Sequence, residues 1–275
     1  MQNIFDSTRK TQEHYPFRAM VMVRVIALVI LLNLQLIGSG TGMAEAHNDA
    51  AEDRQTIAAV SPTVLSKSSN TTDGVAFIDK CLKAAEDYKD YTFDYKQTVY
   101  KDKTVVETGT VMVKKPQLKV LVKSGSKAGS VALLLPNGQV RAHGGGAFKF
   151  ITVTLSADND MLRSANGWPM VQSDFGGIWK AMQGYARQDK CPVKVTEEPV
   201  SEPTQKEKVL VLEMTKPSGE MYKRALIDPK TDLPVEWWDY QQGKVYAHSV
   251  WTDFKGNQGL SDKVFSTTKV EKGDK

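Results

Sequence analysis

The stretch Tyr91-Thr92-Phe93-Asp94-Tyr95-Lys96 decides the fold of this chain, because large aromatic side chains alternate in it with polar ones. Successive side chains of a β-strand point to opposite faces of a sheet, so this two-residue period predicts a strand with one buried face. The same alternation returns within 111–113 and 118–122. No helical period separates these runs, which predicts consecutive antiparallel strands.

Turn residues separate the apolar runs at intervals typical of a β-meander. These turns lie at Lys101-Asp102-Lys103, Lys115-Pro116, 124–129, Pro136-Asn137-Gly138 and Gly144-Gly145-Gly146. After a break at 156–169, a second series of strands is predicted at 193–197, 208–214, 221–228, 235–240 and 244–254. Together the two series predict about ten or eleven strands.

Two segments show the three- and four-residue spacing of amphipathic helices. One begins near Asp73, which we expect as its N-cap, and the other follows Ser173 or Asp174. Two helices are too few to cover both faces of so long a sheet. We therefore predict an α+β fold in which a curved antiparallel half-barrel packs around one or two helices.

The N-terminus carries the pattern of an export signal. Basic residues up to Arg24 precede the apolar run 25–37, and Ala44-Glu45-Ala46 follows it. We expect secretion through the inner membrane into the periplasm, with the leader 1–46 cleaved after Ala46; an uncleaved signal anchor is the alternative, and Met20 or Met22 is an alternative start. Residues 47–72 predict a disordered linker, 73–268 the folded domain and 269–275 a tail.

Charge and cysteine content limit the function classes. Without its leader the chain is nearly neutral and its lysines are spread among acids, so no nucleic-acid partner is expected. Cys81 and Cys191 are the two cysteines, and in an oxidising compartment they predict a disulfide. Two buried free thiols or a metal pair are the alternatives, but zinc would need further clustered ligands.

The sequence nominates no catalytic centre, cofactor or metal site. His143-Gly144-Gly145-Gly146 is similar to the oxyanion loop of lipases, yet no Gly-x-Ser-x-Gly follows, and a hairpin turn explains it better. The acidic pairs Glu197-Glu198 and Asp158-Asp160 are typical of solvated loops. We therefore do not expect an enzyme.

The order of elements, with the strand Gly109-Thr110-Val111-Met112-Val113-Lys114-Lys115-Pro116, resembles the LolA-like periplasmic lipoprotein carriers. The turn Pro136-Asn137-Gly138 and the segment 260–265 add to this resemblance. The stretches 134–145 and 167–179 are closer to an exported bacterial family of uncharacterised function in the same superfamily. The resemblance implies a fold that holds a lipid or lipid-modified partner, with Lys115 in the place of a basic residue that gates the cavity; a solvated strand end is the alternative for Lys115.

Neighbouring residues of a strand point to opposite faces, so Trp237 and Trp238 cannot both face the helices. If the helices fill the inner face only in part, apolar residues of several strands line a cavity for an acyl chain; the alternative is that they complete the core. The candidates are Trp237, Trp238, Trp251, Leu133, Leu135, Val211 and Met214.

Two functions follow from these predictions. The first is an exported, non-enzymatic binding protein for a lipid or lipoprotein, with transient contact to membrane-anchored proteins. The second is a structural or interaction module of the cell envelope with a filled interior. The volume enclosed by the sheet distinguishes them.

Overall fold

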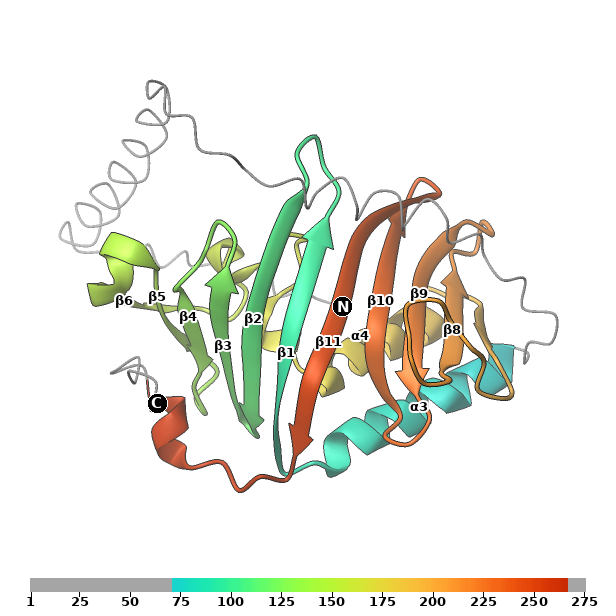
Figure 1. The fold of residues 1–275 in the computed structure, drawn as a ribbon, viewed down its shortest axis with the longest axis horizontal. Coiled ribbons are helices and arrows are strands. Elements are labelled where there is room, and N and C mark those ends of the chain that lie inside the picture. Colours follow the sequence, from blue (N-terminus) through green and yellow to red (C-terminus); the bar gives the residue numbers. More distant parts are fainter. Residues whose placement is uncertain (1–70, 267–275) are drawn as a thin grey trace, which may run out of the picture. The chain divides into compact units, whose positions relative to one another are not determined.

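The computed structural model describes residues 71–266, and the predicted leader, the linker up to residue 70 and the tail 269–275 lie outside the described residues. Within this range, eleven strands form one open, curved antiparallel sheet, which confirms the predicted α+β half-barrel (Figure 1). The strands are β1 (Asp90–Val99), β2 (Val105–Lys114), β3 (Gln117–Ser124), β4 (Val131–Leu134), β5 (Val140–His143), β6 (Thr152–Leu155), β7 (Val193–Val195), β8 (Leu210–Thr215), β9 (Met221–Asp228), β10 (Leu233–Gln241) and β11 (Lys244–Gly256).

The sheet consists of two meanders that meet at its centre. Its strand order is β6-β5-β4-β3-β2-β1-β11-β10-β9-β8-β7, so the first strand pairs with the last. In this pairing Tyr95 lies opposite Trp251 and Gln97 lies opposite Ser249. The inward-facing residues of both meanders therefore continue into one another across the β1–β11 junction.

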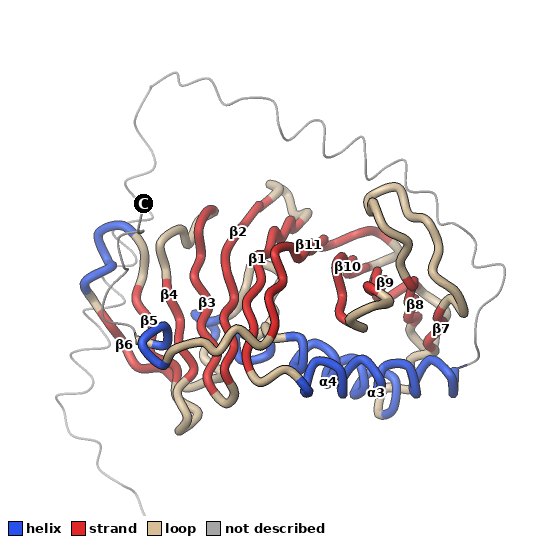
Figure 2. The backbone as a smooth tube through the Cα atoms, turned by 60° about the horizontal axis from the view of Figure 1, so that its bottom comes forward, coloured by secondary structure: helices blue, strands red, loops and turns tan. Residues whose placement is uncertain are grey.

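Two helices pack on the inner face of the sheet, towards its β7–β10 end (Figure 2). Helix α3 (Thr71–Asp87) begins two residues before the predicted cap, so Asp73 lies in its first turn. Helix α4 (Phe175–Arg187) is capped by Asp174 as predicted, since the Asp174 carboxylate accepts a hydrogen bond from the Gly177 amide at 2.9 Å.

Aromatic rings join α4 to the central strand β1. Phe175 stacks on Phe93 with a centroid separation of 4.4 Å, and Tyr91 stacks on Phe175 at 5.7 Å. The Tyr91 hydroxyl accepts a hydrogen bond from the Phe175 amide at 3.2 Å. This fully buried group, with Trp179 and Met182 of α4, fills the half of the inner face that the helices cover.

A smaller core lies on the outer face, where residues 196–209, here called the strap, contact β8, β9 and β10. Val211, Leu226 and Trp238 are buried beneath it. Arg224 donates to Glu202 of the strap at 2.7 Å, and both side chains are almost fully buried. The strap thus covers a second apolar surface that faces away from the helices. No helix within residues 71–266 is long and apolar enough to cross a membrane.

Candidate functional site

A cavity of about 340 Å³ lies on the inner face of the sheet, beside the part that the helices fill. Its floor comes from β1–β6 and from β10 and β11, and its cover is formed by residues 156–173, here called the lid. The lid contains two short 3-10 helices, η2 (Asp160–Leu162) and η3 (Met170–Gln172). The cavity volume falls within the roughly 300–1,000 Å³ of small-molecule sites.

The register of the sheet gives the cavity an apolar floor. One row of inward-facing residues crosses six strands from β1 to β6: Phe93, Val111, Val120, Ala132, Ala142 and Val153. The members on β4 and β5 are alanines. Because these positions have only a methyl group, the floor between the lid and the sheet stays hollow instead of being filled by side chains.

A polar row crosses the same face four residues away from the apolar row along β1 and β2. Ser249 of β11, Gln97 of β1 and Glu107 of β2 lie opposite one another in the register and all line the cavity. The Gln97 amide nitrogen lies 3.4 Å from the Ser249 hydroxyl. Glu107 is only 6% exposed, so its carboxylate faces the cavity and not the solvent. This row places hydrogen-bonding groups at one side of an otherwise apolar hollow.

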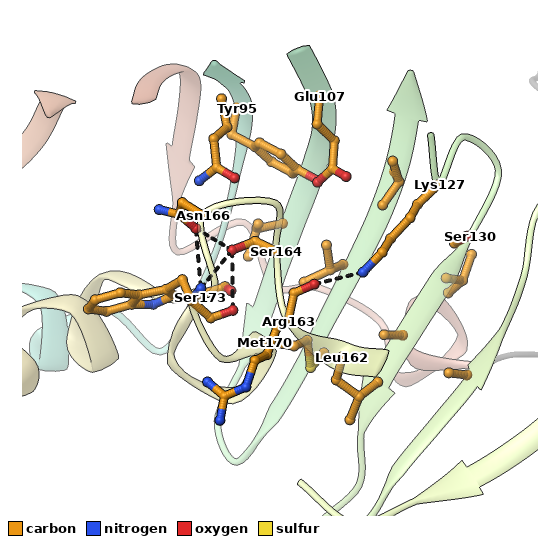
Figure 3. Close-up of a pocket in the computed structure, with 18 of the residues that line it drawn as sticks. Tyr95, Glu107, Lys127, Ser130, Leu162, Arg163, Ser164, Asn166, Met170 and Ser173 are labelled. Atoms are coloured by element: carbon orange, nitrogen blue, oxygen red, sulfur yellow. Dashed lines mark hydrogen bonds between the residues drawn. The ribbon is translucent and has the colours of Figure 1, made fainter. Parts of the chain in front are cut away.

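Tyr95 connects the polar row to the apolar floor. Its hydroxyl donates to a Glu107 carboxylate oxygen at 2.9 Å, and the ring crosses β2 at Gly109 (Figure 3). A Cβ at Gly109 would lie 2.5 Å from Cε1 of this ring and 2.4 Å from the Leu121 carbonyl oxygen. Gly109 is therefore required for the close approach that lets Tyr95 reach Glu107. Burial is the main cause that raises the pKa of Tyr95, with the Glu107 charge adding to it.

Hydrogen bonds from lysines in two hairpin loops attach the lid to the sheet. The Lys127 ammonium donates to the carbonyl oxygens of Arg163 at 2.7 Å and Met161 at 3.3 Å, and Figure 3 shows Lys127 reaching the lid from the β3–β4 loop. Lys101 donates to the Ala165 carbonyl at 3.0 Å. These donors contact lid backbone from two different hairpin ends, so the lid is held at its tip.

A third attachment joins Asn166 of the lid to Asp239 on β10. The Asn166 amide nitrogen lies 3.2 Å from an Asp239 carboxylate oxygen, whose partner oxygen accepts from Lys223 at 2.6 Å and from the Trp237 indole at 2.9 Å. The ammonium of the buried Lys223 thus balances the negative charge of Asp239. The same carboxylate orients Trp237 and anchors the lid.

The structure brings two of the seven proposed cavity residues to the cavity. Trp237 and Trp251 both line it, and their rings meet edge to face at 6.4 Å. Trp238 faces the other side of β10, where it packs with Val211 in the outer core beneath the strap. Met214 is fully buried in the main core between sheet and helices, so it does not border the hollow.

The two leucines of the first meander also lie away from the cavity. Leu133 faces outward, opposite Lys119, whose ammonium holds the C-terminal segment through the carbonyl of Val264 at 2.7 Å. Leu135 lies in the hairpin turn after β4, where its carbonyl accepts from the Gly138 amide. Because neighbouring residues of a strand point to opposite faces, Ala132 lines the cavity and Leu133 does not.

Lys115 does not border this cavity. Its ammonium donates at 3.2 Å to the carbonyl oxygens of Ala85 and Glu86, which belong to the last turn of α3. A lysine at this position satisfies free carbonyls at the negative end of the helix dipole. In this conformation Lys115 ties the β2–β3 hairpin to α3.

The predicted disulfide is absent, because Cys81 and Cys191 are both free, buried thiols. Burial is the main cause that raises the pKa of each thiol, and the charges around them differ. Cys81 is next to Asp232, whereas Cys191 is next to Asp189 beyond the end of α4. The two side chains therefore lie in separate surroundings, which a spacing along the sequence does not reveal.

The glycine-rich loop behaves as a turn. His143 lines the cavity, and its Nδ1 hydrogen-bonds the neighbouring Gly144 carbonyl at 3.0 Å. The acidic pairs Glu197-Glu198 and Asp158-Asp160 are exposed. Within residues 71–266, no group of three or more His, Cys, Asp and Glu side chains is placed to hold a metal ion.

Sequence reasoning missed the polar row and the lid. Gln97 lies on the same face of its strand as the aromatic residues Tyr91, Phe93 and Tyr95. Glu107 likewise lies on the same face as Val111. A polar residue on an otherwise apolar face was therefore the signal that the sequence offered. The lid gave no such signal, because it has neither a two-residue nor a helical period.

Comparison with protein-family models and with curated proteins found no match. Solved structures to which the chain is similar include a DUF1329 family protein from Desulfovibrio piger, at 10% identity and a TM-score of 0.37, covering 71% of this chain and 97% of that chain. A LolA superfamily protein from Nitrosomonas europaea is 11% identical with a TM-score of 0.35, covering 70% and 97%. The MucA/MucB complex of Pseudomonas aeruginosa contains a chain that is 13% identical with a TM-score of 0.43, covering 70% and 60%.

Proposed function

We propose that this protein is an exported binding protein that holds the hydrocarbon part of a lipid, or of a lipid-modified protein, in the cavity of its curved sheet. The observation that carries the proposal is the hollow of about 340 Å³ between an apolar floor and a lid. Each methylene transferred from water to such a floor contributes about 0.8 kcal/mol. A volume at the lower end of the range for ligand sites suits one alkyl chain.

The lid supports a carrier role because its tip is held to the sheet by polar bonds, whereas Met170 near its C-terminal end packs into the main core. Met161 of the lid is 58% exposed, the attachments at Lys127 and Lys101 are exposed polar bonds, and the bond from Asn166 is partly buried. Polar contacts of this kind exchange with water at little cost. A ligand can therefore enter when these contacts open at the lid tip, while Met170 stays packed in the main core.

The second candidate, a cell-envelope interaction module with a filled interior, receives less support. It would need the inner face of β3–β6 to be filled by side chains, and Ala132 and Ala142 leave that space open. We propose a binding role with no catalytic step. Transient contact with membrane-anchored proteins would deliver or remove the ligand.

The location belongs to the same proposal. The chain would be secreted through the inner membrane, lose residues 1–46 and act in the periplasm. N-terminal sequencing of the exported protein is expected to find His47 as the first residue. A first residue upstream of Val25 would contradict cleavage.

A matched pair of substitutions tests the proposed ligand cavity. Ala142→Phe places a ring in the hollow, whereas Thr154→Phe places the same ring on the exposed outer face of the adjacent strand β6. Delipidated protein is titrated with a fluorescent fatty acid. We expect wild type and Thr154→Phe to bind equally and Ala142→Phe to lose at least tenfold in affinity. Equal binding by all three, or none by wild type, would contradict the proposal.

A further inference from the structure

We propose that Glu107, Gln97 and Tyr95 form a head-group site that selects an amphiphile with a positively charged, hydrogen-bond-donating head, such as a primary ammonium. The inference rests on the proposed function, since it names the ligand class of the same cavity. It follows from three observations within residues 71–266: an unpaired carboxylate, an amide oxygen without a hydrogen-bond partner, and cations near the cavity that already have partners.

The first observation is the state of Glu107. Its carboxylate is 6% exposed, and within the described range its polar contact is the single hydrogen bond from Tyr95. No lysine, arginine or histidine among residues 71–266 forms an ion pair with it. Buried carboxylates are ordinarily paired with a cation, and an unpaired one is costly. A ligand ammonium would supply the missing charge.

The second observation concerns Gln97, which lies directly opposite Glu107 across β1 and β2. Its amide oxygen is buried, lines the cavity side of the strand and has no hydrogen-bond partner. Directly opposed side chains in an antiparallel pair have Cβ atoms about 4.5–5.5 Å apart. One donor-rich group can therefore contact the Gln97 oxygen and the Glu107 carboxylate together.

The third observation is that the cations near the cavity are already used. Lys127 donates to two lid carbonyls. Arg163 donates through Nε to Asp160 and through Nη1 to the Gly167 carbonyl. Figure 3 shows Tyr95 and Glu107 together on the sheet side of the cavity and Lys127 directed to the lid. An anionic head would thus meet acceptors at the polar row, which disfavours it.

Three amphiphiles with the same twelve-carbon chain separate head-group choice from chain binding. Dodecylammonium and dodecanoate, each below its critical micelle concentration, and dodecanol, below its solubility limit, displace a neutral fluorescent alkyl probe from the delipidated full chain. We expect dodecylammonium to bind roughly tenfold or more tighter than dodecanoate, with dodecanol between them.

Two variants assign the preference to the polar row. Glu107→Gln keeps the shape and removes the charge, so dodecylammonium should fall to the affinity of dodecanol while dodecanol changes less than twofold. Gln97→Met removes the unpartnered acceptor, together with the long contact to Ser249, and should weaken dodecylammonium binding by about two- to tenfold. The control Glu198→Gln removes one negative charge from an exposed position and should change nothing.

The outcomes distinguish the two proposals. If no amphiphile binds wild type, the proposed function fails and the head-group site fails with it. If all three bind but dodecanoate equals or exceeds dodecylammonium, the cavity stands and the head-group site is refuted. If Glu107→Gln loses affinity for all three ligands equally and has a lower midpoint of thermal unfolding, Glu107 is structural and the head-group site is refuted. If that variant does not fold, the order of the three affinities in wild type and the effect of Gln97→Met test the head-group site.

Discussion

Replacing Lys127 by methionine is expected to loosen the lid, because this one ammonium makes two hydrogen bonds to lid carbonyls, at 2.7 and 3.3 Å. Its side chain lies in an exposed loop, so solvent screening reduces each bond to about 0.5–1 kcal/mol. The loss of both would shift the balance between closed and open lid by about 1–2 kcal/mol, which is roughly a 5- to 30-fold change.

Hydrogen–deuterium exchange measures this shift at the lid itself. The amides of Ser164 and Gly167 are bonded within the lid turn, so their exchange reports its local opening. We expect Lys127→Met to accelerate exchange across 160–168 and to speed release of a bound fluorescent fatty acid by a similar factor. The global midpoint of unfolding should change little, because the main core is untouched.

Lys123→Met is the matched control. It removes an ammonium from the end of β3, four residues earlier, where Lys123 pairs with Asp94 at 2.8 Å and makes no bond to the lid. Its exchange and release rates should equal those of wild type. Unchanged lid exchange in Lys127→Met, or equal acceleration in both variants, would refute the reasoning that Lys127 holds the lid.

Three further predictions follow from single sites. Gly109→Ala forces the Tyr95 ring from its place and should lower the free energy of unfolding in urea by about 1–3 kcal/mol; no change would contradict the close approach. Burial alone would raise the pKa of Glu236, but hydrogen bonds, first of all from His248, outweigh it and hold that pKa below its ordinary value. Its contribution to stability is therefore present above about pH 4.5 and is lost as the pH falls through the folded-state pKa, so Glu236→Gln should show a shallower acid loss than wild type in urea titrations. Both cysteines should titrate as two free thiols in unfolded, unreduced protein and resist a thiol reagent when folded; a count of zero would indicate a disulfide.

The strands were predictable where one face of a strand is apolar and the other polar. Tyr91, Phe93 and Tyr95 define such a phase, and the structure places all three on the inner face. The pairing of β1 with β11 was not predictable, because it joins residues such as Gln97 and Ser249 that lie far apart in the sequence. Long-range register depends on the assembled sheet and not on local propensity.

The site was predictable only in part for the same reason. Alternation showed that Trp237 and Trp238 face opposite sides, but which of them faces the cavity depends on where the helices and the strap lie. Lys115 was interpreted by its place before a proline, whereas its contacts come from the end of α3. For Cys81 and Cys191, the interval along the chain carried no information about their distance in space.

The cavity exists because two helices cover only part of an eleven-stranded sheet. Beside α4, Phe175 stacks on Phe93 and packs with the main core on the inner face. Beyond them the cover is the lid, which has no regular apolar stripe and is attached by bonds from side chains to its backbone and to Asn166. Opening of the lid tip therefore exposes the apolar floor, while Met170 of η3 holds the C-terminal end of the lid in the core beside α4. The polar row lies on the strands where the two meanders meet, so a ligand head bound there would contact the sheet while its chain lies on the apolar floor that the lid covers.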